Sequence, residues 1–129
     1  IPGLEPLIDA VKERVRVSGR LRALDGRPIF CRAEHAALNY LLQSAGAIIS
    51  KRWVVVSQDM LDTAGLTYDH DYTRCAYVHD EQQFSVLPSE AQNVVDLVEA
   101  AALKAGEYYN FRVPITAAGD IGDNWAATH

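Results

Sequence analysis

Apolar residues near the start of the chain recur at steps of three and four, the spacing of one helical face. This pattern predicts a helix over residues 6–17, ended by Ser18-Gly19. A longer apolar run predicts a second helix over residues 33–64, which could be interrupted at residues 54–56. Because most of its surface is apolar, we expect this second helix to be central and buried.

Runs rich in β-branched and aromatic residues predict two hairpins. The first has strands over residues 20–24 and 27–32, joined by Asp25-Gly26, a pair typical of a two-residue type I′ turn. The second has strands over residues 75–78 and 84–87. Its tip is predicted to hold His79, Asp80 and Glu81.

The last third of the chain predicts a helix, an edge strand and a tail. Ser89 is a suitable N-cap for a helix over residues 90–105, and Gly106 would end it. Residues 110–116 read as a strand at an edge, because a proline interrupts them. Trp125 should anchor the tail. The order of elements predicts an α+β fold, in which helices pack on one side of a small antiparallel sheet.

The tip of the second hairpin is the first candidate for chemistry. It lacks the Asn-Gly or Asp-Gly pair that a two-residue turn prefers. Asp80 and Glu81 place adjacent carboxylates on a rigid hairpin, and such oxygens are the ligands that hard divalent cations take. The alternative is a solvated acidic turn with no ligand, and the residues alone leave both open.

The long helix carries a row of polar side chains on its apolar background. His35, Asn39 and Gln43 recur at every fourth position and therefore share one face. Amide and imidazole donors on one face could contact the minor-groove acceptors that every base pair presents. The alternative is a row of hydrogen-bonded structural amides.

Charge is distributed unevenly along the chain. The net charge of −5 argues against nucleic acid, yet residues 1–52 carry nine Lys and Arg against five Asp and Glu, whereas residues 53–129 carry three against twelve. Guanidinium groups match phosphate oxygens, so the basic half suits a nucleic-acid backbone, although ordinary surface charge explains it equally well. The arginines expected to bind DNA are Arg20, Arg22, Arg27 and Arg32.

Two further features limit the class of protein. Cys31 and Cys75 match no zinc-ligand spacing, so we expect free thiols in a reducing compartment. No run of 18 apolar residues is present, so we expect no membrane span.

Four stretches in order resemble family A DNA polymerases, the DNA polymerase I family, and most of all their bacteriophage type. Val78-His79-Asp80-Glu81 is similar to the palm motif, and Leu24-Asp25-Gly26-Arg27 to the hairpin before the long palm helix. Residues 35–47 resemble that helix, including its Asn and Gln four residues apart. Residues 124–129 resemble the family's ending, with a final His. The likeness covers residues 24–129.

The resemblance implies nucleotidyl transfer from a deoxynucleoside triphosphate (dNTP) to a primer 3′-hydroxyl, supported by two Mg²⁺ ions in the complete enzyme. Asp80 would ligate the ions, Glu81 would assist, and His79 would position the primer terminus. The family's roles also place His129 near the site. They give contacts with the primer–template minor groove to Asn39 and Gln43, and by extension to His35.

The resemblance also divides the chain. Residues 1–38 would be the C-terminal end of the fingers, a helix plus a β-hairpin, and residues 39–129 the C-terminal part of the palm. The family's other metal-binding Asp and its nucleotide-binding fingers helix have no counterpart here, so we expect a fragment that is inactive without the N-terminal part of the polymerase. Expected partners are primer–template DNA and dNTP, in the cytoplasm of a bacterial or phage-infected cell. The alternatives are a palm fragment of a single-subunit RNA polymerase and a non-catalytic, palm-like nucleic-acid-binding module.

Overall fold

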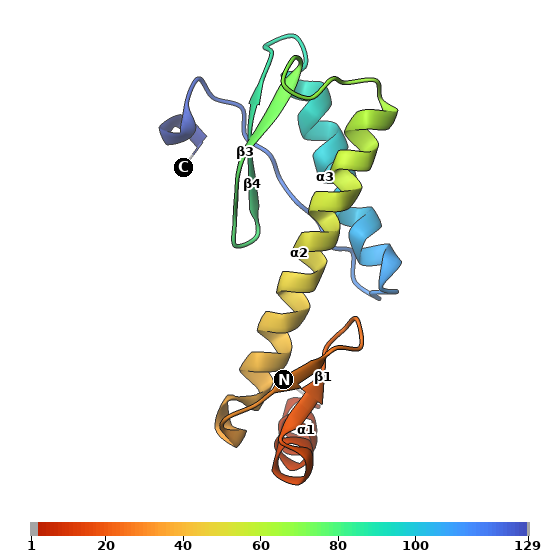
Figure 1. Cartoon of the computed structure of the whole chain (residues 1–129), viewed down its shortest axis with the longest axis vertical. Helices are drawn as coiled ribbons and strands as arrows, with labels where there is room; N and C mark the ends of the chain where they lie inside the picture. Colours follow the sequence, from red (N-terminus) through yellow and green to blue (C-terminus); the bar gives the residue numbers. More distant parts are fainter. Residues whose placement is uncertain (1–2, 129) are drawn as a thin grey trace. The chain divides into compact units, whose positions relative to one another are not determined.

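The computed structural model describes residues 3–128 and consists of two compact units, Ile1–Ile48 and Ile49–His129 (Figure 1). The long helix α2, Ala37–Thr63, contributes residues to both units. The first unit also holds α1 (Leu4–Ser18), β1 (Arg20–Arg22), β2 (Pro28–Phe30) and the 3₁₀ helix η1 (Glu34–Ala36). The second unit holds β3 (Tyr72–Val78), β4 (Glu81–Val86), α3 (Ala91–Tyr108) and the 3₁₀ helix η2 (Trp125–Thr128).

The core of the first unit lies between α1 and the β1–β2 hairpin. Leu21 and Ile29 are paired across the two antiparallel strands, and they pack on the same side against Val11 and Val15 of α1. The predicted helix end is confirmed, because Gly19 has a left-handed φ of 65° and its N–H donates to Val15 O. Since side chains alternate along a strand, the opposite face of the hairpin is left to solvent.

The turn of this hairpin differs from the predicted two-residue type I′ turn. Ala23 N–H donates to Arg27 O at 2.8 Å, which closes a three-residue loop over residues 24–26. Gly26 has φ of 88°, but Asp25 is not in the left-handed region that a type I′ turn requires. Instead Asp25 Oδ1 accepts a hydrogen bond from Arg27 N–H at 3.2 Å. The Asp-Gly pair therefore makes the longer loop with glycine in its left-handed position.

The long helix is continuous, and the interruption considered at residues 54–56 is absent. β-branched side chains lower helix propensity only slightly. Trp53, just before them, is held by its Nε1–H donating to Val98 O of α3 at 2.7 Å. The expectation of a buried helix is wrong for this chain at several positions. Leu42 is 59% exposed and Val55 is 50% exposed.

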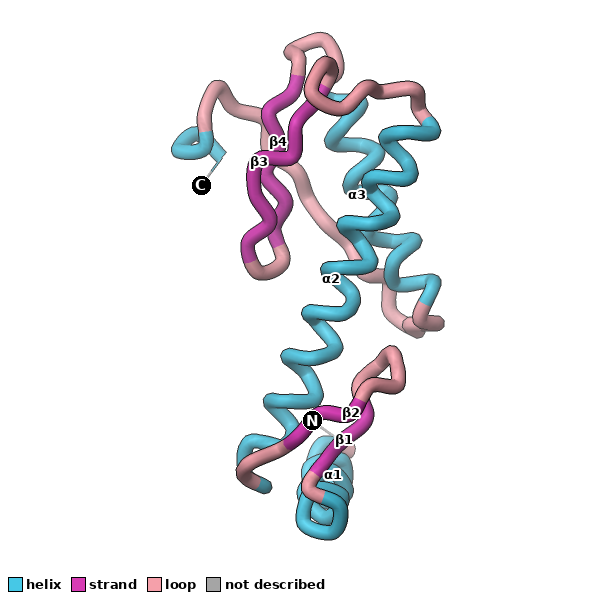
Figure 2. Tube along the Cα trace, viewed as in Figure 1, coloured by secondary structure: helices cyan, strands magenta, loops and turns pink. Residues whose placement is uncertain are grey.

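The strands form two separate two-stranded antiparallel sheets rather than a single sheet (Figure 2). The predicted strand over residues 110–116 does not form, because this segment packs on α3 instead. Gly106 lies inside α3 and does not end it, and a Cβ there would approach Ile115 Cγ1 to 2.7 Å. The glycine therefore provides the close approach that lets the segment lie on the helix.

The start of α3 also differs from the prediction. Ser89 is not the N-cap. The N-cap position is occupied by Glu90, whose side chain makes no capping hydrogen bond.

The tail is held along α3 by its backbone. Gly119 N–H donates to Glu99 Oε1 at 2.8 Å, and a Cβ at Gly119 would come within 2.9 Å of Val95 Cγ1. Trp125, the residue expected to anchor the tail, lies in η2 and is 55% exposed. His129 lies outside the described residues.

The core of the second unit is made by α2, α3 and the β3–β4 hairpin. Its buried members include Leu61, Tyr72, Val94 and Val98. The ring of Phe84 on β4 packs against this cluster and lies 6.2 Å from the ring of Tyr72. These contacts fix the hairpin on α2 at the end remote from its turn.

A polar network also ties the hairpin to α2, from Arg74, which pairs with Phe84, to Gln82, two residues nearer the turn. The side chain of Ser57 on α2 is fully buried, and its Oγ lies 3.2 Å from Gln82 Oε1 and 3.0 Å from Val54 O. Arg74 Nη2 on β3 donates to Ser57 Oγ at 3.3 Å and to Val54 O at 3.4 Å. The guanidinium also lies 5.1 Å above the Phe84 ring. Both strands of the hairpin are thus tied to one turn of α2.

We expect Ser57→Ala to lower the free energy of unfolding by about 1–3 kcal/mol, because a partly buried Gln82 oxygen would lose its hydroxyl donor. Urea unfolding followed by circular dichroism measures the loss. Ser85→Ala is the matched control, since Ser85 is exposed on the same hairpin. It should change the free energy by less than about 0.5 kcal/mol. Equal losses in the two variants would contradict a stabilising role for Ser57.

Candidate active site and nucleic-acid interface

The turn of the β3–β4 hairpin is shorter than predicted. Val78 pairs with Glu81, so Glu81 is the first residue of β4 and only His79 and Asp80 form the turn. His79 has a left-handed φ of 55°, a conformation uncommon for residues other than glycine but less so for His. Both turn residues are exposed. The tight turn therefore presents these two side chains to solvent from a defined backbone.

The two neighbouring carboxylates have different surroundings. Asp80 is exposed at the turn, whereas Glu81 is partly buried and accepts a hydrogen bond from Gln83 Nε2, two residues along the same strand. The Gln83 amide thus holds the Glu81 carboxylate beside the turn. Asp80 remains accessible to a ligand.

The acidic residues of the hairpin are candidates for part of the coordination shell of a divalent cation. Among residues 3–128 no group of three or more His, Cys, Asp or Glu is arranged to hold a metal ion. Mg²⁺ commonly takes one or two carboxylates and completes its octahedron with water and phosphate oxygens. Asp80, with Glu81 beside it, can supply such carboxylates.

Sequence reasoning missed the residues that hold the hairpin in place, Ser57, Arg74 and Gln82. Burial lowers the pKa of Arg74 below its ordinary value, yet guanidinium remains protonated in proteins. Its charge is therefore kept in a partly buried position between the hairpin and α2. The sequence did offer one indication of this network: Arg74 is the single arginine in the β-prone run before the hairpin turn.

Of the predicted polar row, Asn39 and Gln43 share one face of α2, whereas His35 precedes that helix. His35 is in η1, and Asn39 and Gln43 follow in the first turns of α2. All three residues are exposed. Asn39 and Gln43 are four residues apart in a regular helix and so lie one above the other. The structure thus leaves this row accessible to a ligand.

The arginines of the first hairpin are not equivalent. Arg20, Arg22 and Arg32 are exposed. Arg27 is also exposed, but its Nε and Nη2 lie 2.6 and 2.5 Å from Asp25 Oδ2. The hydrogen bond from the Arg27 side chain lowers the pKa of Asp25. Arg27 is therefore partly neutralised by its neighbour.

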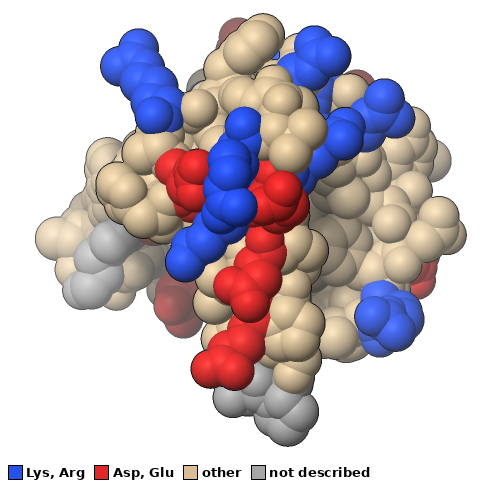
Figure 3. Space-filling model, turned by 90° about the horizontal axis from the view of Figure 1, so that it is seen from below, with Lys and Arg blue, Asp and Glu red and all other residues tan. Residues whose placement is uncertain are grey.

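The basic character of the first half is further reduced on α1. Arg16 Nη1 lies 2.6 Å from Glu13 Oε2, and its Nε lies 3.5 Å from Glu34 Oε1. Figure 3 shows acidic and basic side chains next to one another on one face of the molecule. The unbalanced charge predicted from the sequence is therefore concentrated on a few arginines rather than spread over a uniform patch.

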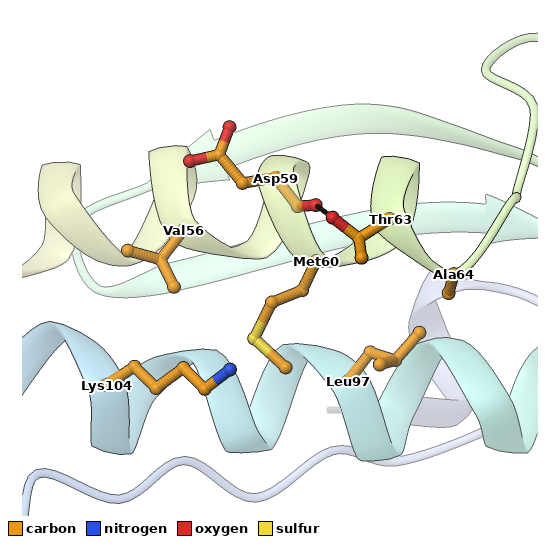
Figure 4. Close-up of a pocket in the computed structure, with 7 residues that line it drawn as sticks. All are labelled: Val56, Asp59, Met60, Thr63, Ala64, Leu97 and Lys104. Atoms are coloured by element: carbon orange, nitrogen blue, oxygen red, sulfur yellow. Dashed lines mark hydrogen bonds between the residues drawn. The ribbon is translucent and has the colours of Figure 1, made fainter.

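A shallow groove of about 430 Å³ lies between α2 and α3. In Figure 4 the Met60 side chain extends toward α3, whereas Asp59 points away from it. The lining of the groove includes two charged residues, Asp59 and Lys104, and no residue of the hairpin turn. Its lining residues are Val56, Asp59, Met60, Thr63, Ala64, Leu97 and Lys104.

No helix within the described part of the chain has both the length and the apolar character needed to cross a membrane.

Comparisons with known proteins agree with the resemblance found in the sequence. The family model for DNA polymerase family A matches residues 8–127. A DNA-directed DNA polymerase of Escherichia phage T7 is 42% identical over an alignment of 112 positions, which covers 84% of this chain and 16% of the relative. A DNA-directed DNA polymerase of Escherichia phage Phieco32 is 36% identical over an alignment of 138 positions, which covers 99% of this chain and 21% of the relative.

A solved structure gives the same result for the fold. It is described as the POL domain of Pol1 from M. smegmatis in complex with DNA primer-template and dNTP. It matches 88% of this chain and 21% of its own length, with 26% identity and a TM-score of 0.74. The chain thus spans only about a sixth to a fifth of the relatives it matches. Because the family model covers nearly all of its residues, the chain belongs to DNA polymerase family A.

Proposed function

We propose that this chain is the C-terminal part of a template-directed DNA polymerase, which adds a nucleotide from dNTP to a primer 3′-hydroxyl. The observation that carries the proposal is the exposed Asp80 carboxylate on the tight turn of a hairpin fixed to α2. The names of the phage relatives, and the primer-template and dNTP bound in the solved neighbour, support the reaction and the partners. Those relatives favour the cytoplasm of an infected bacterial cell as the place of action.

In this proposal the chain contains parts of two polymerase subdomains. Residues 1–38 form the end of the fingers, and residues 39–129 form the C-terminal part of the palm. The chain spans about a sixth to a fifth of its relatives, so the remaining ligands of the reacting centre come from the preceding part of the polymerase.

Each residue near the hairpin turn has a separate task. Asp80 holds the Mg²⁺ ions, and Glu81, oriented by Gln83, assists beside it. Metal ions in such a centre stabilise charge on the attacking and leaving oxygens. His79 positions the primer terminus from its place in the turn. His129 would complete the surroundings of the site.

The exposed row of the first unit supplies the contacts with DNA. Asn39 and Gln43, with His35 beside them, donate hydrogen bonds to acceptors in the minor groove, which scarcely distinguish one base pair from another. This indifference to sequence suits an enzyme that must hold every correct pair. The exposed arginines bind the phosphate backbone.

The comparisons favour this reading over a single-subunit RNA polymerase, since the relatives are DNA-directed DNA polymerases. The non-catalytic binding module is the remaining alternative. It differs from the proposed enzyme in one respect that can be measured, the need for the Asp80 carboxylate during nucleotide addition.

We expect Asp80→Asn in the full-length protein to slow single-turnover nucleotide incorporation by at least about 10²- to 10³-fold, because it removes one strong electrostatic stabiliser of the transition state. Glu81→Gln should slow it less. The affinity for primer–template should change little, since the row and the arginines remain. Asp120→Asn, a change at an exposed acidic residue of the tail, is the control and should incorporate at the wild-type rate.

Near wild-type incorporation by Asp80→Asn would show that the hairpin turn is a solvated acidic turn, and the enzymatic proposal would fail with it. Measuring the incorporation rate over a range of Mg²⁺ concentrations distinguishes a lost metal ligand from a folding defect. A lost metal ligand raises the Mg²⁺ concentration needed for half-maximal rate, whereas a general folding defect does not.

We expect the 129-residue chain alone to have no polymerase activity, because one carboxylate pair does not complete a two-metal site. Primer extension with Mg²⁺ and all four dNTPs measures this. Extension by the purified chain would contradict the proposed division of the active site.

We expect the arginines of the first hairpin to differ in their contribution to DNA binding. Each lost phosphate contact should flatten the dependence of log K on log salt by about one unit. Arg20→Ala and Arg22→Ala should each do so on primer–template DNA. Arg27→Ala should have a smaller effect, because Asp25 already neutralises part of its charge. Equal slopes in all three variants would contradict this distinction.

A further inference from the structure

The outward face of the β1–β2 hairpin combines an exposed aromatic ring with two arginines. Phe30 is 74% exposed, the highest value among the large apolar residues that the structure describes. It lies directly opposite Arg20 in the register, and Arg22, paired with Pro28, lies diagonally from it. In a hairpin such positions are about 5 Å and about 7–8 Å apart. A planar group resting on the ring is therefore within reach of both guanidinium groups.

The two guanidinium groups are available for a ligand. Within residues 3–128, Arg20 and Arg22 form no ion pair with an acidic side chain, unlike Arg16 and Arg27. The inward residue between them, Leu21, is buried in the core of the unit. The outward direction of both arginines is thus fixed by the packing of the other face.

The aromatic ring and the two positive charges of this face favour some ligands over others. An apolar protein segment laid over Phe30 would remove two unpaired cations from water without compensation, which is costly. A single strand of nucleic acid offers a base to the ring and phosphates to the arginines at once. Stacking on an aromatic side chain is tolerant of sequence, because every base has a π-face.

We propose that this face, formed by Phe30, Arg20 and Arg22, binds unpaired single-stranded DNA, namely the template strand beyond the primer–template duplex. A base stacks on Phe30 while adjacent phosphates contact Arg20 and Arg22. The inference rests on the proposed function, which supplies the template. It adds a site for the unpaired strand to the minor-groove contacts of the polar row.

Equilibrium binding by the full-length protein, without dNTP, tests the proposal. Two DNAs are compared, a blunt duplex and the same duplex with a template overhang of several nucleotides. Phe30→Ala should weaken binding of the overhang DNA by roughly 5- to 100-fold, the range for loss of one stacked base. It should leave binding of the blunt duplex unchanged. The salt-slope change caused by Arg20→Ala should likewise be confined to the overhang DNA.

Matched variants separate stacking from other effects. Phe30→Trp should retain or strengthen overhang binding, whereas Phe30→Leu, which keeps an apolar side chain without a π-face, should behave as Phe30→Ala does. Val17→Ala is the control, since Val17 is 73% exposed in the same unit. Melting temperatures should stay at the wild-type value in all variants, because Phe30 contributes little to the core.

Two results overturn the inference while leaving the proposed function intact. In one, Phe30→Ala binds the overhang DNA as well as the wild-type protein does, or loses affinity for both DNAs equally. In the other, Phe30→Ala lowers the melting temperature with no change in overhang binding, which identifies a covering protein segment. Failure of the wild-type protein to bind either DNA would instead reject the proposed function itself.

Discussion

The hydrogen bonds among Ser57, Gln82 and Arg74 are the constraint on which the candidate site depends. A two-stranded hairpin is marginally stable by itself in water, so its turn is a fixed feature only if the strands are held by something else. Apolar contacts from Tyr72 and Phe84 hold the end remote from the turn. The polar network adds contacts at the level of Phe84, through Arg74, and nearer the turn, through Gln82. The position of Asp80 relative to α2 follows from both sets of contacts together.

This arrangement separates the two acidic residues beside the turn. Glu81 is the first residue of a strand, so its side chain stands beside that of Gln83 on the same face and receives its amide. Asp80 precedes the strand and is exposed in the turn. The two adjacent carboxylates thus differ in their exposure to solvent. A site with this arrangement can use the exposed Asp80 as a ligand and the partly buried Glu81 as a residue that assists it.

Much of this fold could be predicted from the sequence, because its local signals are strong. Periodicity gave α1 and the long helix, and Gly19 ended α1 as expected. The errors arose where tertiary contact decided the outcome. Residues 110–116 have strand-like composition, but Gly106 opens a path along α3 that they follow instead. At the hairpin turn, the exposed His79 and Asp80 were predictable from their charge. The hydroxyl and guanidinium that fix the hairpin are joined across a long stretch of sequence, and no local pattern reveals such a pair.

The first hairpin shows how burial on one face can determine chemistry on the other. Leu21 and Ile29 must face α1, and side chains alternate strictly along a strand. A slip of one residue would place Arg20 and Phe30 in the core and Leu21 in solvent. Packing therefore penalises a one-residue slip of the register. The three-residue loop with Gly26 in its left-handed position fits the register that is found. The same apolar contacts that stabilise the unit thus fix the ring and its two arginines on one open surface.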